Sequence, residues 1–221
     1  GMIYVNGIPV VVFEFKTAIQ ENCTIHNAYV QLTTRYKRDI PELFKYNAFC
    51  VISDGVNNKA GSFFAPYEFY YAWRRISGLS KDVDGIDSMF TLIQGMLHQN
   101  RLRDIIQNFI VFEVESGKLI KKITRYQQFR AVHKTVNKIK TGKSKKEKGG
   151  VIWHTQGSGK SISMCCYAGK ILQQPAMHNP TLLIVTDRND LDGQLFETFS
   201  NAQDLLKQTP VQANNRDELR R

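Results

Sequence analysis

Residues 154–161 read His-Thr-Gln-Gly-Ser-Gly-Lys-Ser, a combination that can bind the phosphates of ATP. In such a turn the backbone N–H groups converge on one concavity, and the glycines allow an approach that a Cβ would block. Lys160 would neutralise the terminal phosphates, and the Ser161 hydroxyl would ligate Mg²⁺. The usual pattern is GxxxxGK[ST], and His154 stands where the first glycine is expected. The predicted ATP-binding residues of this loop are Thr155, Gln156, Gly157, Ser158, Gly159, Lys160 and Ser161.

A second combination lies near the amino end, in the run PVVVFEFK from Pro9 to Lys16. A strand has a side-chain period of two, so Glu14 and Lys16 share one face. A carboxylate that holds Mg²⁺, beside a lysine that orients or activates the attacking water, is an arrangement that cleaves phosphodiesters. Glu and Lys also alternate on ordinary half-buried strands, so this spacing alone leaves both interpretations open.

The apolar pattern predicts the elements that carry these residues. Residues 10–15 and 47–53 read as buried strands, and residues 24–37 have the spacing of an amphipathic helix. Residues 89–112 predict a helix followed by a short strand, and residues 118–139 predict a helix.

The pattern changes after residue 150. Residues 140–150 (KTGKSKKEKGG) contain no apolar residue and predict a loop. Residues 151–153 then predict a strand, 161–173 a helix and 181–185 another strand. This segment contains a strand, a turn, a helix and a second strand within about 35 residues, which is the size of one βαβ unit. The pattern therefore predicts the start of a parallel sheet.

The segment RYQQFRA, residues 125–131, is by itself a piece of helix. Its position before a phosphate-binding loop resembles the adenine-sensing Q motif of superfamily 2 helicases. The resemblance implies that Arg125 and Gln128 bind ATP, with Gln127 as the alternative register.

The segment LLIVTDRNDLDGQLFETF, residues 182–199, resembles the DNA-contacting motif Ia of the same motors, which implies that Thr186 and Arg188 bind DNA. No apolar strand ends in an Asp-Glu pair, because Asp217-Glu218 lies in a polar run. We also expect no second motor domain that would supply an arginine finger. Phosphoryl transfer needs these charges in place. We therefore expect the chain to bind ATP but to hydrolyse it little or not at all.

The order of the motifs, VNGIPVVVFEFKT, QLTTRY, NAFCVISDG, RYQQFRA, WHTQGSGKS and IVTDRNDLDGQ, closely resembles the R (motor and endonuclease) subunit of type I restriction enzymes, from Val5 to Phe199. The implied fold is α/β. A partial restriction-endonuclease-like domain (1–118) is followed by a helix with the Q motif and a basic linker (119–148). Residues 149–221 are then expected to form the beginning of a RecA-like P-loop domain with a parallel sheet.

That family's nuclease is of the PD-(D/E)xK type, so the resemblance implies that Glu14 is a metal ligand and that Lys16 is catalytic. Its helical glutamine–tyrosine motif is matched by Gln31 and Tyr36. In an α-helix Arg35 shares the face of Gln31 and Tyr36 lies well away from it, so Gln31 is the better match.

The family's first catalytic aspartate precedes the glutamate, and residues 1–13 contain no Asp or Glu. We expect the chain to begin just after that aspartate and its nuclease centre to be incomplete.

The implied activity is Mg²⁺-dependent cleavage of double-stranded DNA coupled to ATP-driven translocation. The implied cofactors are Mg²⁺ and ATP, and the implied partners are the modification and specificity subunits of the restriction complex. Two other classes stay open: a P-loop small-molecule kinase, and a non-catalytic assembly module in which both motifs are vestigial.

The formal net charge of +10 favours a polyanionic partner. Seven lysines and one acid lie between Lys134 and Lys148, a run that fits DNA binding or a solvated basic linker. No apolar run approaches the roughly 18 residues that cross a bilayer. The four cysteines form no CxxC pair, so we expect a cytoplasmic protein without membrane contact. The DNA-binding lysines are predicted to be Lys143, Lys145 and Lys146.

Overall fold

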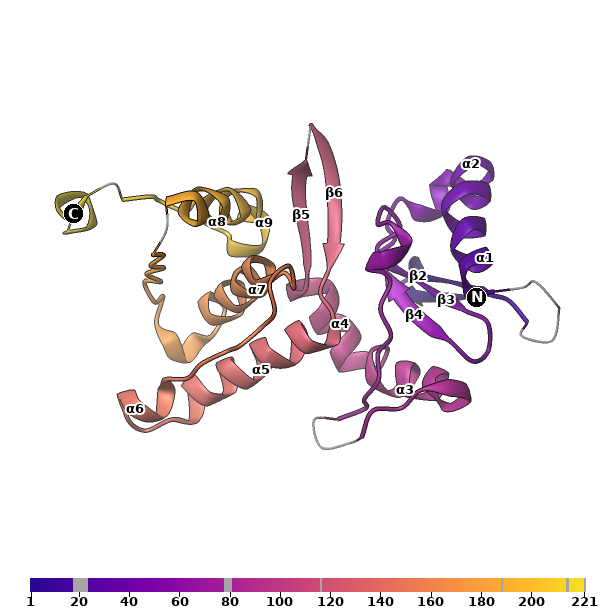
Figure 1. The fold of residues 1–221 in the computed structure, drawn as a ribbon, viewed down its shortest axis with the longest axis horizontal. Helices are drawn as coiled ribbons and strands as arrows, with labels where there is room; N and C mark the ends of the chain where they lie inside the picture. The colour runs from indigo at the N-terminus through magenta and orange to yellow at the C-terminus, as the bar shows by residue number, and fades with distance from the viewer. Residues whose placement is uncertain (18–23, 78–80, 116, 188, 214, 221) are drawn as a thin grey trace. The chain divides into compact units, whose positions relative to one another are not determined.

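Short strands and helices divide between two units, each with its own buried apolar residues. The computed structural model describes residues 1–221 except 18–23, 78–80, 116, 188, 214 and 221. The first unit comprises Gly1–Ile110 and Glu115–Gln127, and the second comprises Val111–Val114 and Gln128–Arg221 (Figure 1). The mixed α/β class predicted from the sequence is confirmed.

The sheet of the first unit contains the strands β1 (Met2–Val5), β2 (Ile8–Phe15), β3 (Phe49–Ser53) and β4 (Asn58–Gly61), in that order. β2 runs antiparallel to β1 and parallel to β3, and β3 runs antiparallel to β4. Asn6 and Gly7 connect β1 to β2 with φ angles of 50° and 81°, as a two-residue hairpin turn with left-handed backbone requires. The parallel register pairs Glu14 with Ile52, so the predicted catalytic acid lies on an inner strand.

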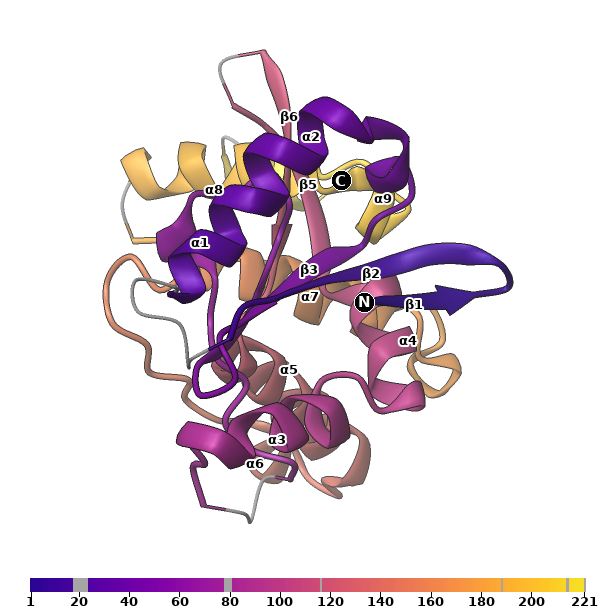
Figure 2. The same ribbon diagram turned by 90° about the vertical axis from the view of Figure 1, so that its right-hand side faces the viewer.

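A nearly continuous helix covers one face of this sheet, over the residues predicted to be helical. It consists of α1 (Ile25–Val30), the π-helix η1 (Gln31–Tyr36) and α2 (Lys37–Asp39). Its fully buried residues Ala28 and Leu32 pack in one cluster with Val12 and Ile52 of the strands. Figure 2 shows α1 and α2 on one side of β2 and β3 and α3 (Ser88–Gly95) on the other.

Between β4 and α4 (Gln99–Asn108) the described chain contains two short 3₁₀ helices, η3 (Tyr67–Phe69) and η4 (Gly85–Asp87), and the helix α3. α4 precedes β5 (Ile110–Glu115). β5 and β6 (Lys118–Ile123) form a separate two-stranded sheet. The predicted helix over 118–139 is therefore wrong in its first part. The run KLIKKI pairs with β5, which satisfies its backbone groups, and the helix begins only at Tyr126.

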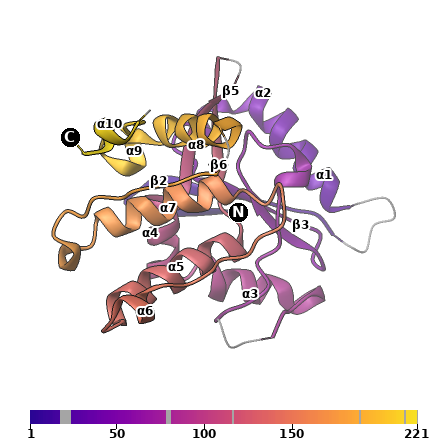
Figure 3. The ribbon, with the colours of Figure 1, turned by 60° about the vertical axis from the view of Figure 1, so that its left-hand side comes forward.

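The second unit is helical in all its described secondary structure apart from residues of β5. Its core lies where α7 (Lys160–Leu172) packs against α8 (Asn189–Asn201) and α9 (Gln203–Leu206). The buried residues there include Cys165, Ile171 and Leu205. Figures 1 and 3 show α7 between α5 and the α8–α9 pair. The other helices are α5 (Tyr126–Thr141), α6 (Lys145–Lys148) and α10 (Arg216–Arg220).

The two strands predicted on either side of α7 do not form. Residues 151–153 and 181–185 have no ladder partner among the described residues. Val151, Trp153 and Val185 are 94%, 81% and 81% exposed. A β-strand is stabilised by hydrogen bonds to neighbouring strands. The apolar pattern of a segment indicates which side chains can be buried, and it does not indicate which strand the segment pairs with.

The loop predicted over 140–150 is partly helical. α5 continues to Thr141, and α6 (Lys145–Lys148) follows after three residues. The Ser144 hydroxyl caps α6 by accepting the backbone N–H of Glu147 at 3.2 Å, and the Glu147 carboxylate accepts the Lys143 backbone N–H at 2.8 Å. A serine followed three residues later by a glutamate is a capping box, which stabilises the start of a helix. This local signal explains why α6 forms in a segment whose composition predicted a loop.

Among the described residues, no helix combines the length and the apolar character that a membrane crossing requires.

Candidate functional site

Glu14 and Lys16 lie side by side at the carboxyl end of β2. The Glu14 side chain is 10% exposed and that of Lys16 is 19% exposed. The Lys16 backbone N–H donates to the Ser53 carbonyl at 2.7 Å, which continues the parallel ladder for one residue beyond β2. The two side chains form an ion pair with 2.9 Å between Lys16 Nζ and Glu14 Oε1. The shared face predicted from the period of two is confirmed.

Gln31 and Tyr36 complete a closed circuit of hydrogen bonds with this ion pair. Lys16 Nζ also donates to Gln31 Oε1. Gln31 Nε2 donates to the Tyr36 hydroxyl at 2.9 Å, and that hydroxyl donates to Glu14 Oε2 at 2.9 Å. These four residues, here called the Glu14 cluster, bring one strand and one helix together at a single carboxylate.

The position of Tyr36 corrects the expectation that it would lie away from Gln31. In an α-helix, residues five apart differ by about 140° around the axis. Residues Gln31–Tyr36 form a π-helix, in which the hydrogen-bonded turn closes over five residues instead of four. Both side chains therefore face β2, and the exposed Arg35 does not take the place of Tyr36.

Glu14 is the single carboxylate in this cluster. Its oxygens accept bonds from Lys16 and Tyr36. No group of three or more His, Cys, Asp or Glu side chains suited to a metal ion occurs in the described part of the chain. A hard divalent ion prefers several oxygen ligands, so these residues by themselves do not fit a tightly bound Mg²⁺.

The phosphate loop, His154–Ser161, leads directly into α7. Gly157 and Gly159 have φ angles of 72° and 75°, and Gly159 is the residue that precedes the first turn of the helix. Lys160 Nζ donates to the carbonyls of His154 and Thr155 at 3.2 and 3.3 Å. The loop is thus closed on itself by its own lysine, and its two glycines adopt left-handed backbone conformations that glycine reaches without steric strain.

The remaining loop residues differ in exposure. Thr155 and Gln156 are exposed, whereas Ser158 and Ser161 are half-buried. The Ser158 hydroxyl donates to the Thr155 carbonyl at 2.7 Å, which tightens the turn. Ser161 stands in the first turn of α7, where backbone N–H groups have no partner within the helix.

Of the two glutamines in the predicted Q motif, the structure places Gln128 at the phosphate loop. Gln128 is 4% exposed, and its amide donates to the carbonyls of Ser158 and Gly159. Gln127 is exposed.

Arg125 lies in the first unit. Its guanidinium carbon stands 3.7 Å from the centre of the Tyr71 ring and its Nη2 donates to the Tyr71 hydroxyl. Burial raises the pKa of Tyr71 and the Arg125 charge opposes that rise. Nothing in the sequence pattern around Tyr71 indicated this partner.

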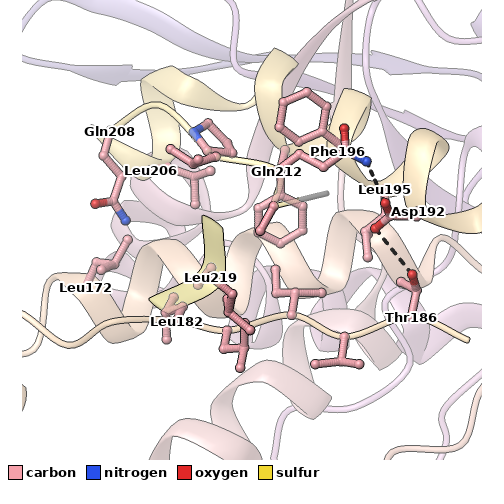
Figure 4. Close-up of a pocket in the computed structure, with 18 of the residues that line it drawn as sticks. Leu172, Leu182, Thr186, Asp192, Leu195, Phe196, Leu206, Gln208, Gln212 and Leu219 are labelled. Atoms are coloured by element: carbon pink, nitrogen blue, oxygen red, sulfur yellow. Dashed lines mark hydrogen bonds between the residues drawn. The ribbon is translucent and has the colours of Figure 1, made fainter. Parts of the chain in front are cut away.

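Thr186 lies on a pocket of about 520 Å³ in the second unit (Figure 4). Its hydroxyl donates to Asp192 Oδ1 at 3.3 Å, and Gln212 Nε2 donates to the other oxygen of Asp192. Sequence reasoning missed Asp192, which follows Thr186 by six residues in a run of polar residues. Arg188 lies outside the described residues. The pocket's apolar lining includes Leu172, Leu182, Leu195, Phe196, Phe199, Leu206 and Leu219.

The three lysines predicted to bind DNA are all exposed. Lys145 and Lys146 belong to α6, and Lys143 precedes its cap. No acidic side chain other than Glu147 lies between Lys134 and Lys148, so the α6 region carries concentrated positive charge.

Two family matches cover most of the chain. Residues 2–69 match the N terminus of the type I restriction enzyme R protein, and residues 127–221 match the SWI2/SNF2 ATPase family. The first match contains the Glu14 cluster and the second contains Gln128 and the phosphate loop.

Curated relatives extend the similarity across nearly the whole chain. The endonuclease subunit of the type I restriction enzyme HindI from Haemophilus influenzae is 46% identical over 98% of this chain and 21% of its own length. A putative type I restriction enzyme endonuclease subunit, MjaIXP from Methanocaldococcus jannaschii, is 31% identical over 95% of this chain and 23% of its own. The corresponding SauCOLORF180P subunit from Staphylococcus aureus is 25% identical over 90% of this chain and 20% of its own.

The chain thus spans about a fifth of the length of these relatives. Its motifs, its two family matches and its similarity to these subunits agree: the chain belongs to the R (endonuclease) subunits of type I restriction enzymes.

Proposed function

We propose that this chain is the part of a restriction subunit that joins a DNA-cleaving centre to an ATP-driven motor on double-stranded DNA. The nuclease part would occupy residues 1–118, the connecting helix and basic segment 119–148, and the start of the motor 149–221. The observation that carries the proposal is the presence, in one chain, of the Glu14 cluster and of a phosphate loop with Gln128 held against it. The modification and specificity subunits are the expected partners.

At the nuclease centre, Glu14 would contribute one ligand to Mg²⁺, which supplies charge stabilisation at the phosphodiester. Lys16 would hold its ammonium beside the scissile phosphate, and Gln31 would keep that ammonium in place through its amide oxygen. Tyr36 would fix the orientation of the Glu14 carboxylate. The four side chains support one another, so the loss of any of them should disturb the others.

The register of the sheet indicates where a second carboxylate would complete this centre. Met2 stands opposite Val12, and Gly1 and Phe13 exchange backbone hydrogen bonds of 2.8 and 3.0 Å. A residue added on the amino side of Gly1 in a continued β1 would stand opposite Glu14. Cross-strand partners share a face of the sheet, so an aspartate there would point toward the same ion.

This position can be tested by adding an aspartate before Gly1, with an added asparagine as the matched control. The aspartate should strengthen Mg²⁺ binding measured by titration calorimetry, and Glu14→Gln in the same chain should remove the gain. The chain without the aspartate should nick plasmid DNA negligibly. Robust cleavage that survives Glu14→Gln would move the centre to other residues.

The phosphate loop fits a nucleotide. Its two glycines adopt left-handed conformations that leave no Cβ in the cradle, and α7 presents its N-terminal N–H groups to the same region. Phosphate oxygens would replace the carbonyls of His154 and Thr155 as the acceptors of Lys160. The Ser161 hydroxyl and the Mg²⁺ that accompanies ATP would complete the contacts.

Nucleotide binding is tested by thermal unfolding with Mg-ATP or a non-hydrolysable analogue. Ligand at a hundred times its Kd should stabilise the part that binds it by about 2.7 kcal/mol. Lys160→Ala should lose most of the shift, whereas Lys134→Ala, which removes an exposed lysine of α5, should keep it. Equal shifts in all three proteins would show that the loop is not the site.

A further inference from the structure

Gln128 forms two hydrogen bonds with the backbone of the phosphate loop. Its Nε2 lies 3.1 Å from the Ser158 carbonyl oxygen and 2.9 Å from that of Gly159. A Cβ at residue 159 would lie 2.5 Å from the same nitrogen, so the glycine is required for this approach as well as for its left-handed φ of 75°. Gln128 is 4% exposed and lies in the first turn of α5.

These two hydrogen bonds determine where the neighbouring N–H groups point. A trans peptide is planar, with its C=O and N–H directed to opposite sides. When the carbonyls of Ser158 and Gly159 face Gln128, the N–H groups of Gly159 and Lys160 face away from it. Those N–H groups belong to the turn and to the first turn of α7, where an anion binds.

The Gly159 carbonyl has a second role that makes this arrangement stiff. It accepts the backbone N–H and the hydroxyl of Ser163, each at 3.1 Å, in the first turn of α7. Ser158 is also tied to the Thr155 carbonyl through its backbone and its hydroxyl. Gln128 therefore joins an interlocked set of bonds at the point where the loop becomes a helix.

We propose that Gln128 is a positioning residue for the phosphate loop, which sets the affinity for the polyphosphate chain of any nucleotide rather than only the choice of adenine. The amide NH₂ has two donors, and two loop carbonyls accept from it. The proposal rests on the proposed nucleotide site. The positioning role differs from base recognition in one consequence. Loss of the Gln128 amide should weaken the binding of a polyphosphate without a base as much as the binding of ATP.

The test compares ATP, GTP and inorganic tripolyphosphate, each with Mg²⁺, by titration calorimetry. Gln128→Ala should raise the Kd of all three ligands by a similar factor, about tenfold for two lost hydrogen bonds. Gln127→Ala, at the exposed neighbouring glutamine, should leave all three unchanged. A loss confined to ATP, or no loss for tripolyphosphate, would overturn the proposal in favour of base recognition.

A measurement without ligand separates this proposal from the nucleotide site itself. Gln128→Ala should speed amide hydrogen exchange at Gly159–Ser163 in the free protein, and Gln127→Ala should not. Gln128→Met, which keeps the side-chain volume and lacks the donors, should behave like Gln128→Ala and guards against a packing defect. Failure of the unchanged chain to bind any of the three ligands would refute the proposed site, and unchanged exchange rates in both variants would refute the positioning role.

Discussion

Lys121 is a buried cation outside both candidate sites. It is 6% exposed, and its ammonium donates to the Asn47 carbonyl just before β3. Burial lowers its pKa from an ordinary 10.5 to about 8, and the nearby Cys50 thiol opposes that shift. The same burial raises the pKa of Cys50 to about 12. The ammonium thus holds β6 against the amino end of β3 at the cost of its hydration.

This lysine should make stability depend on pH in an identifiable window. The folded pKa lies below the unfolded one, so between about pH 8 and 10.5 the unfolded chain binds the additional proton. The free energy of unfolding contributed by Lys121 should therefore rise with pH, by at most about 1.4 kcal/mol per unit. The contribution is complete above 10.5 and is lost as the pH falls through about 8.

Lys121→Met should abolish this component, seen as the difference between the urea unfolding curves of variant and unchanged chain at several pH values. Lys118→Met removes an exposed lysine from the same strand and should leave the profile as it was. A difference that does not vary between pH 8 and 10.5 would mean that Lys121 titrates in the folded protein as it does in the unfolded chain.

At the scale of elements, the π-helix brings Tyr36, five residues after Gln31, into the Glu14 cluster. Leu32 is fully buried in the core, whereas Gln31 and Tyr36 are half-buried and face Glu14. π turns are rare and occur frequently at functional sites, because the extra residue redirects side chains that follow it. Here that extra residue lets a glutamine and a tyrosine five positions apart meet at one carboxylate.

Deletion of the exposed Thr34 should convert this segment to an α-helix and leave the cluster intact. The tyrosine would then stand four residues after Gln31, which is the same face of an α-helix. Deletion of Val30, which is 42% exposed, should instead rotate Ile25 and Ala28 out of register with Leu32. The free energy of unfolding should then fall by several kcal/mol, about as much as when core side chains are truncated. Chemical denaturation of the two variants distinguishes the cases, and equal losses would contradict the assignment of the π turn as the adjustable element.

At the scale of the whole chain, the basic residues are concentrated in one stretch while the rest is only mildly basic. α6 and its cap hold part of this stretch in a helix, so the lysines project from an ordered backbone. Non-specific binding to DNA releases counterions, and each phosphate neutralised adds about 0.9 to the slope of log K against log salt.

Replacement of Lys143, Lys145 and Lys146 by Gln should flatten that slope by about 2.7 if all three contact phosphates. Lys37, Lys45 and Lys118 are exposed lysines of the first unit, and their triple replacement should change the slope less. Fluorescence anisotropy with duplex DNA over a range of salt concentrations provides the measurement. An unchanged slope in the first variant would make the α6 region a basic connection without a DNA contact.

The sequence by itself determined the features that depend on local chemistry. Glu14 and Lys16 share a face because side chains alternate between the two faces of a strand. The phosphate loop was identifiable because its glycines, lysine and serine must be adjacent in the chain to surround a phosphate.

Only the tertiary structure decided the features that depend on distant partners. Tyr36 joins Glu14 because packing of Leu32 against the sheet accompanies a π turn that no period in the sequence reveals. The apolar residues 151–153 and 181–185 remain unpaired because a strand needs neighbours that local pattern does not supply. Gln128 reaches the Gly159 carbonyl across 31 positions of sequence, a contact that the fold of the second unit makes and that no spacing along the chain specifies.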